Sequence, residues 1–134
     1  MNREKLINAF QQTATAQNYT FYSAEDRHLT QMVKHYPAIW LSPPEFHSME
    51  GCNHGTVIYN VTLHALHLGA KLDEKQREAR STELEQSLIE LFSSLSEFDF
   101  IAEVDNLRIK HSSHTLTTLG DVTATATAEV ITIF

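Results

Sequence analysis

The chain has few of the residues that signal covalent cross-links or cofactor chemistry. It has one cysteine, Cys52, so no internal disulfide is expected. Its four glycines are isolated at positions 51, 55, 69 and 120, so there is no glycine-rich loop of the kind that cradles phosphates. No apolar run approaches the ~18 residues of a membrane span. The first ten residues, MNREKLINAF, hold no apolar stretch of signal-peptide length. We therefore expect a cytoplasmic protein with no membrane partner.

Positive charge is also scarce. The chain has 10 Lys and Arg against 17 Asp and Glu, a net charge of −7. Residues 1–67 carry 4 basic and 5 acidic groups, whereas residues 68–134 carry 6 basic and 12 acidic groups. An acidic surface repels the phosphate backbone of nucleic acids, and the sequence has no local basic patch. Specific nucleic-acid binding is therefore not expected.

What is present fits one small globular domain. A chain of 134 residues is the length of a single domain, residues 1–134, and can bury roughly two-thirds of its unfolded surface. A hydrophobic fraction of 42% and a mean hydropathy of −0.27 are typical of soluble proteins. The sequence shows no internal repeat and no interdomain linker.

Two segments have the periodicity of amphipathic helices. In residues 2–17, apolar side chains recur at Leu6, Phe10 and Ala14, and Asn18 is a plausible stop. In residues 73–97, an apolar stripe covers only the second half, so the polar first half is expected to extend beyond the domain body or to contact a partner. The stripe consists of Leu84, Leu88, Leu91, Phe92 and Leu95.

Local signals mark the ends of the helical segments. Asp73 followed by Gln76 has the pattern of a capping box, so the long helix should begin there. Residues 23–36 predict either a short helix or an irregular loop, because their apolar stripe is thin. Pro37 disfavours helical geometry at Tyr36, so a helix in this segment should end there.

Four segments are predicted as strands. Residues 38–42 are short and apolar and end at Pro43-Pro44, while residues 47–55 read as a turn that leads into the clear strand of residues 56–68. Residues 100–109 and 122–134 form the second pair. Side chains alternate in residues 56–68, and one face is the better core face. That face consists of Val57, Tyr59, Val61, Leu63, Ala65 and His67.

The last two strands carry further signals. We expect an irregularity at Asp105-Asn106. The final strand has a face of small residues, which would let the Leu-rich helix lie close to the sheet. That face consists of Val122, Ala124, Ala126, Ala128 and Val130. The predicted fold is α+β: a four-stranded, mostly antiparallel sheet with helices packed on one face, in the order α, (α or loop), β, β, α, β, β.

The best candidate for a metal site is His47-x4-Cys52-x-His54 in the predicted turn. Thiolate and imidazole suit zinc, and Glu50 or His67 is a candidate fourth ligand. The spacing matches no standard zinc module, however, and scattered histidines beside one cysteine are common. The preferred interpretation is a polar turn with a reduced thiol, with no metal and no cofactor.

No catalytic residues are predicted. Cys52 and His54 have no signal for the third, orienting group of a nucleophilic site. His64 and His67 lie three apart in a strand, so they should point to opposite faces. His111 and His114 are also three apart, in a predicted turn.

The order of elements resembles a known family, the tail-terminator or tail-completion proteins of long-tailed phages and prophages. The resemblance rests on the N-terminal helix with its aromatic turn (residues 2–22), the motif Tyr36-Pro37-Ala38-Ile39-Trp40-Leu41 before a strand, and the strand of residues 56–68 running into the helix of residues 73–97. The final strands then close the chain. The match is one of element order, which covers most of the sequence, together with one short motif.

The resemblance implies a non-enzymatic structural protein that assembles with itself as a ring, typically a hexamer. Such a ring caps the tail-tube protein and presents a surface to head–tail connector proteins. It forms in the cytoplasm during assembly and ends in the virion tail. The alternative is a small zinc-binding or ligand-binding α+β protein that uses the His47, Cys52 and His54 loop. A deep apolar pocket that holds an Asp or Glu with a raised pKa would favour ligand binding.

Overall fold

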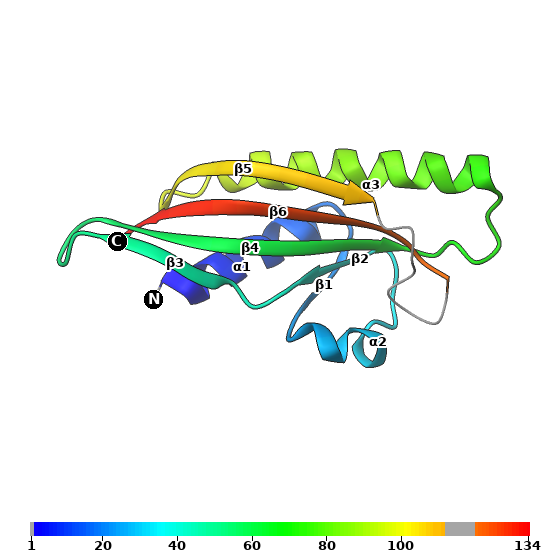
Figure 1. Ribbon diagram of the computed structural model, residues 1–134, viewed down its shortest axis with the longest axis horizontal. Coiled ribbons are helices and arrows are strands. Elements are labelled where there is room, and N and C mark those ends of the chain that lie inside the picture. The colour runs from blue at the N-terminus through cyan, green and yellow to red at the C-terminus, as the bar shows by residue number, and fades with distance from the viewer. Residues whose placement is uncertain (1, 112–119) are drawn as a thin grey trace.

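The computed structural model describes residues 2–111 and 120–134, which form helices and one twisted sheet (Figure 1). In chain order the elements are α1 (Asn2–Ala16), β1 (Thr20–Ser23), the 3-10 helix η1 (Asp26–His28), α2 (Leu29–Met32), β2 (Ala38–Leu41), β3 (Glu45–Glu50), β4 (Thr56–His67), α3 (Glu74–Leu95), β5 (Ile101–His111) and β6 (Val122–Ile133). The α+β class predicted from the sequence is confirmed.

The sheet has six strands and is open. Its order is β1-β2-β4-β6-β5, and β3 also pairs with β4. Strand β1 runs parallel to β2, and the other pairs are antiparallel. Because β4 has 12 residues, two short strands fit along the same edge of it. Strand β2 pairs with residues 63–66 of β4, and β3 pairs with residues 56–60.

The prediction of four strands was wrong by two. Strand β1 lies in a short aromatic run, and its extended form depends on pairing with β2. Thr20 pairs with Ala38, which lies 18 residues further along the chain. Strand β3 reads as part of a turn because it is polar, and its six residues are exposed or half-buried. The actual turn is shorter and includes Gly51, whose φ of 88° favours glycine. The mostly antiparallel pairing predicted for the sheet is present, and β2 pairs antiparallel with β4.

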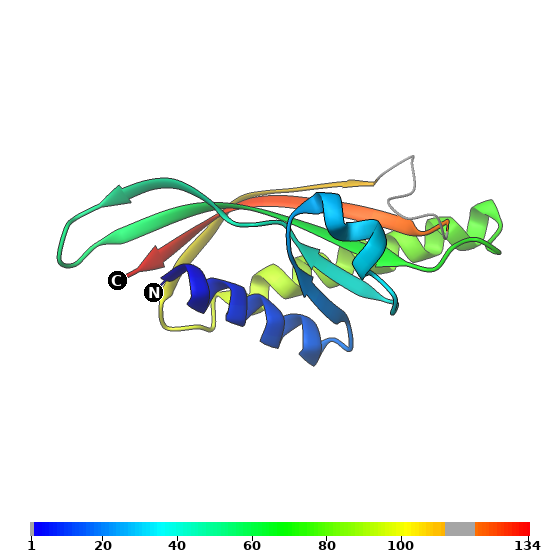
Figure 2. The ribbon, with the colours of Figure 1, turned by 90° about the horizontal axis from the view of Figure 1, so that it is seen from below.

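Helices α1 and α3 pack on one face of the sheet, which we call the helix face (Figure 2). The predicted core face of β4 except His67, which is half-buried, belongs to one buried cluster together with the alanine row of β6 and the leucine stripe of α3. Phe10 of α1 meets Phe92 of α3 edge to face, with ring centroids 5.8 Å apart. The side chains of Ala124, Ala126 and Ala128 are small, so α3 lies close to the sheet, as the sequence predicts.

The opposite face of the sheet, here called the second face, is also partly covered. Segments η1 and α2 pack there against Trp40, whose side chain is 0% exposed, and Leu66. The prediction that all helices lie on one face was therefore wrong. Residues 23–36, predicted as either a short helix or an irregular loop, contain η1 and α2, and Leu29 and Val33 cover a large indole that points away from the main core.

Three of the predicted local signals are confirmed, whereas the helix predicted to end at Tyr36 already ends at Met32. Asp73 accepts a hydrogen bond from the amide of Gln76, whose side chain accepts one from the amide of Asp73, which completes the capping box. Helix α1 ends before Asn18, which has a φ of 65°. The irregularity in β5 falls between Asp105 and Arg108, where Asn106 has a φ of 53°.

The polar first half of α3 is tied down at one point. Its buried residues begin at Leu84, so residues 74–83 contribute no apolar side chain to the core. Arg77 fixes this half to the rest of the fold: its Nη1 donates to the carbonyl oxygens of Gly69 (2.8 Å) and Gly120 (3.4 Å), and its Nη2 donates to that of Asp121 (3.4 Å). The guanidinium thereby joins α3 to two loops.

The contribution of α3 to the core can be measured with neighbouring residues. Leu88→Ala removes a fully buried side chain, and we expect the free energy of unfolding to fall by about 2–5 kcal/mol. Ile89→Ala, one position along, removes a side chain that is 40% exposed and should cost about 1 kcal/mol or less. Chemical denaturation monitored by circular dichroism tests both, and equal losses would contradict the packing described.

Candidate functional site

Three strands of the sheet, β1, β3 and β5, have an edge with which no other described strand pairs, and the edges of β3 and β5 lie on opposite sides of the molecule. Within residues 2–111 and 120–134, β5 pairs only with β6, and β3 pairs only with β4. Each therefore presents amide and carbonyl groups that no other described strand satisfies. Such edges are templates for pairing with another chain unless charges, prolines or bulges disfavour it.

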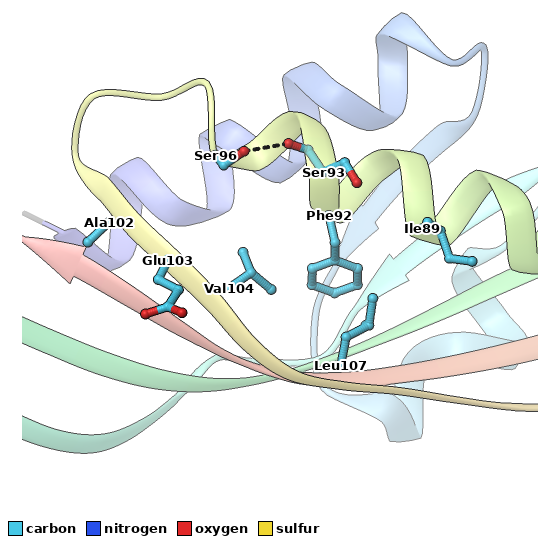
Figure 3. Close-up of a pocket in the computed structure, with 8 residues that line it drawn as sticks. All are labelled: Ile89, Phe92, Ser93, Ser96, Ala102, Glu103, Val104 and Leu107. Carbon is cyan, nitrogen blue, oxygen red and sulfur yellow. Dashed lines mark hydrogen bonds between the residues drawn. The ribbon is translucent and has the colours of Figure 1, made fainter.

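A groove runs along the β5 edge between this strand and α3 (Figure 3). Its volume is about 360 Å³, and it is open to solvent. Apolar side chains dominate it, and Ile89 and Leu107 are 40% and 36% exposed. Ser96 donates a hydrogen bond to the carbonyl oxygen of Ser93 at its rim, 2.7 Å away. The lining residues are Ile89, Phe92, Ser93, Ser96, Ala102, Glu103, Val104 and Leu107.

The opposite edge carries the two most exposed large apolar side chains among the described residues. Phe46 and Met49, both in β3, are 61% and 50% exposed. The ring of Phe46 contacts Tyr59 edge to face, with centroids 6.5 Å apart. Met49 borders a second, mostly apolar hollow with Asn2, Val57 and Phe134. Phe46 therefore does not lie in the core.

A polar cluster on the second face holds η1 against the sheet. The carboxylate of Asp26 accepts hydrogen bonds from Trp40 Nε1 (3.0 Å) and Ser42 Oγ (2.6 Å), both through Oδ1. His64 Nε2 lies 3.5 Å from Asp26 Oδ2, and its Nδ1 shares a hydrogen bond of 2.8 Å with Thr125 Oγ1. Burial alone would raise the pKa of Asp26, but the two hydrogen bonds and the nearby His64 outweigh it and lower the pKa.

The cluster contains serine, histidine and aspartate but is not arranged as a nucleophilic triad. In a triad the imidazole stands between hydroxyl and carboxylate so that it can take the hydroxyl proton. Here Asp26 stands between Ser42 and His64, and Ser42 donates directly to the carboxylate. The arrangement orders the Trp40 indole and the η1 segment, which is a structural role.

The structure separates the residues of the predicted metal site. His47 lies in β3 with its Nε2 3.9 Å from Glu129 Oε1, whereas Cys52 and His54 are exposed in the turn between β3 and β4. In the described part of the chain, no three His, Cys, Asp or Glu side chains form a group that could hold a metal ion. The structure therefore does not bring His47, Cys52 and His54 together, nor does it add Glu50 to them.

The other histidines lie apart from this turn. His64 belongs to the second face and His67 to the opposite, helix face, as predicted from their spacing. Burial lowers the pKa of His67, and the nearby Arg80 lowers it further. His111 Nε2 lies 3.2 Å from Glu85 Oε1 across the gap between β5 and α3. His114 lies outside the described residues.

No protein-family model matches the chain, and no curated protein matches it significantly. Among the helices in residues 2–111 and 120–134, none is both long and apolar enough to span a membrane.

The role of Asp26 can be tested by pH. Its pKa in the folded state is below the value of about 3.8 in the unfolded chain, so its stabilisation is complete above that value and is lost as the pH falls through the lowered pKa. We expect Asp26→Ala to reduce the free energy of unfolding by on the order of 1 kcal/mol at pH 7, since the carboxylate is partly exposed.

The matched control is Glu25→Ala, which removes an exposed carboxylate paired with Arg27 at 2.8 Å and should cost about 0–0.5 kcal/mol. Urea denaturation at pH 7 and pH 3 measures both. The difference between wild type and Asp26→Ala should narrow at pH 3, and a constant or widening difference would contradict the assigned interactions.

Proposed function

We propose that the chain is a non-enzymatic structural protein that assembles head to tail into a closed ring, and that this ring is the terminator at the end of a phage or prophage tail tube. The observation that carries the proposal is the pair of unpaired strand edges, β3 and β5, on opposite sides of one sheet. Each edge has exposed apolar side chains beside it: Phe46 and Met49 at β3, Ile89 and Leu107 at β5.

Symmetry explains why two different edges favour a ring. When one surface of a copy binds a different surface of the next, the contact leaves both kinds of surface free at the ends of the chain of copies. The chain of copies then either closes into a ring or grows as a filament. The fold itself is compatible with many functions. The tail-terminator role and the number of six copies in the proposal therefore both come from the resemblance in element order.

The shape of the surface favours assembly over small-molecule chemistry. The groove beside β5 and the hollow beside Met49 are open to solvent, while ligand sites are usually enclosed enough to bury most of their ligand. The carboxyl group with a lowered pKa, Asp26, is occupied in holding Trp40 and Ser42. The partners proposed are further copies of the chain, the tail-tube protein and the head–tail connector.

Native mass spectrometry over a concentration series, with and without purified tail tubes, tests this function. We expect a metal-free closed oligomer, six copies on the resemblance, either in solution or on the tubes. A chain that stays monomeric at high concentration and does not bind tubes would refute the proposal, and a monomer carrying one zinc ion would favour the alternative.

The variant Phe46→Ser/Met49→Ser tests the β3 edge in the same experiment. It removes two exposed apolar side chains, and interface anchors of this kind contribute about 2 kcal/mol or more, so the oligomer should weaken by roughly 30-fold. Met32→Ser is the control, because Met32 is 41% exposed but lies on α2, away from both edges. Equal oligomerisation of the two variants would exclude the β3 edge as an interface.

A further inference from the structure

We infer that β3 of one copy pairs antiparallel with β5 of the next copy and places Phe46 and Met49 in the groove between α3 and β5. The inference rests on the proposed ring and names the contact that would close it. The occupant of the groove is thus a defined segment of a second copy of this chain.

The direction of pairing follows from the topology. Strands β3, β4, β6 and β5 are antiparallel in succession, so β3 runs antiparallel to β5 within one copy. In a ring whose strands lie roughly along the axis, rotation about that axis preserves strand direction. The β3 edge of one copy therefore meets the β5 edge of the next in antiparallel orientation, and the two sheets become continuous.

A bulge in each strand gives the two edges matching apolar spacing. In β5, Asp105 and Arg108 lie opposite Glu129 and Thr127, so three steps along β5 match two along β6. This shift puts Leu107, like Val104, beside α3 in the groove.

Strand β3 has the same kind of shift. Phe46 and Met49 lie opposite Tyr59 and Val57, so three steps along β3 match two along β4. Both partners, Tyr59 and Val57, belong to the buried core on the helix face. Two apolar side chains three residues apart therefore point to the helix face in each edge strand.

Matching these apolar pairs defines one register. In antiparallel pairing, Met49 lies beside Val104 of the next copy and Phe46 beside Leu107. The aromatic ring and the thioether then cover the groove floor formed by Ile89 and Leu107, which is exposed in a single copy. Burial of such side chains is the main favourable term in most protein association.

The same register pairs charges on the second face. Glu45 lies opposite Arg108, while Asp105 lies opposite Ser48 and diagonal to His47. Neither Glu45 nor Arg108 has an ion-pair partner among the described residues of its own copy, so both are available. One like-charge pair, Glu50 and Glu103, falls at the end of the contact, where solvent screens it most.

Pairing of β5 with a second β5 is the main competitor. Around the bulge, Asp105 and Glu103 would lie opposite Arg108 and Lys110 in such a two-fold contact. However, α3 runs along β5 on the helix face, so two-fold pairing would bring two copies of α3 together over the seam (Figures 1 and 2). The β3–β4 hairpin projects beyond the helices in both views, so no helix of the incoming copy lies over its free end.

Cysteine cross-linking tests the contact and its register. In a Cys52→Ser background, the variant Phe46→Cys/Leu107→Cys carries one thiol on each edge. Mild oxidation at a concentration where copies associate, or on tail tubes, should give a ladder of disulfide-linked multimers ending in a closed ring. Phe46→Cys alone and Leu107→Cys alone should each remain uncross-linked, and Glu74→Cys/Phe46→Cys controls for random collision.

Each outcome of the cross-linking separates the hypotheses. A dimer from Leu107→Cys alone would show β5 pairing with β5 and overturn the inference. A closed oligomer in native mass spectrometry without a ladder would also overturn the inference, while the proposed ring stood. Absence of any oligomer, with or without tubes, would refute the ring and the inference together.

A charge exchange gives an independent readout that does not depend on thiols. Glu45→Arg or Arg108→Glu alone places like charges opposite each other and should weaken association by up to about fivefold per contact. The double variant Glu45→Arg/Arg108→Glu restores the pair and should recover association. Both residues are exposed, so the fold should persist in circular dichroism. Failure of the double variant to recover would contradict the proposed register.

Discussion

The long antiparallel pairing of β4 with β6 is the constraint on which the rest of the structure depends. Twelve successive residue pairs, from Thr56 opposite Ile133 to His67 opposite Val122, fix which side chains face each side of the sheet. Because a slip of one residue would exchange the two faces, this register sets the core. The alanine row of β6 then lets α3 approach, and α1 packs beside α3. Strands β2, β3 and β5 attach to the two sides of this central pair.

The same arrangement leaves the sheet open. The chain adds short strands to one side of β4 and a single strand to one side of β6, and nothing in the described residues covers the outer edges of β3 and β5. Isolated proteins usually disfavour pairing at such edges with charges and bulges, and β5 has both. In an assembling protein the same bulges set the spacing of apolar side chains, so they can select a partner strand as well as exclude others. At these edges and in the groove, backbone hydrogen-bonding groups and apolar side chains are therefore exposed that no other described part of the fold covers.

Sequence reasoning recovered the elements that local chemistry specifies. The capping box at Asp73, the stop at Asn18 and the irregularity beside Asn106 are all signalled by neighbouring residues, and each is present. Strand β3 was missed because its side chains are polar and its extended form depends on β4 across the turn. The groove beside β5 was also missed, because it forms between Ile89 of α3 and Leu107 of β5, and the sequence alone does not show that these residues lie close together. The proposed metal residues share a short stretch of sequence, but β3 takes His47 into a strand and leaves Cys52 in the turn.

The sequence by itself determined the α+β class, the two main helices, the core face of β4 and the close approach of α3 to the alanine row of β6. These features follow from side-chain periodicity and from capping, which act over a few residues. Tertiary structure alone decided that β1 and β3 are strands, that Trp40 is buried beneath α2 on the second face, and that β1, β3 and β5 each keep an edge that no other described strand pairs with. Strand pairing joins backbone groups that are distant in the chain, so its presence or absence at an edge depends on which segments the folded sheet brings together.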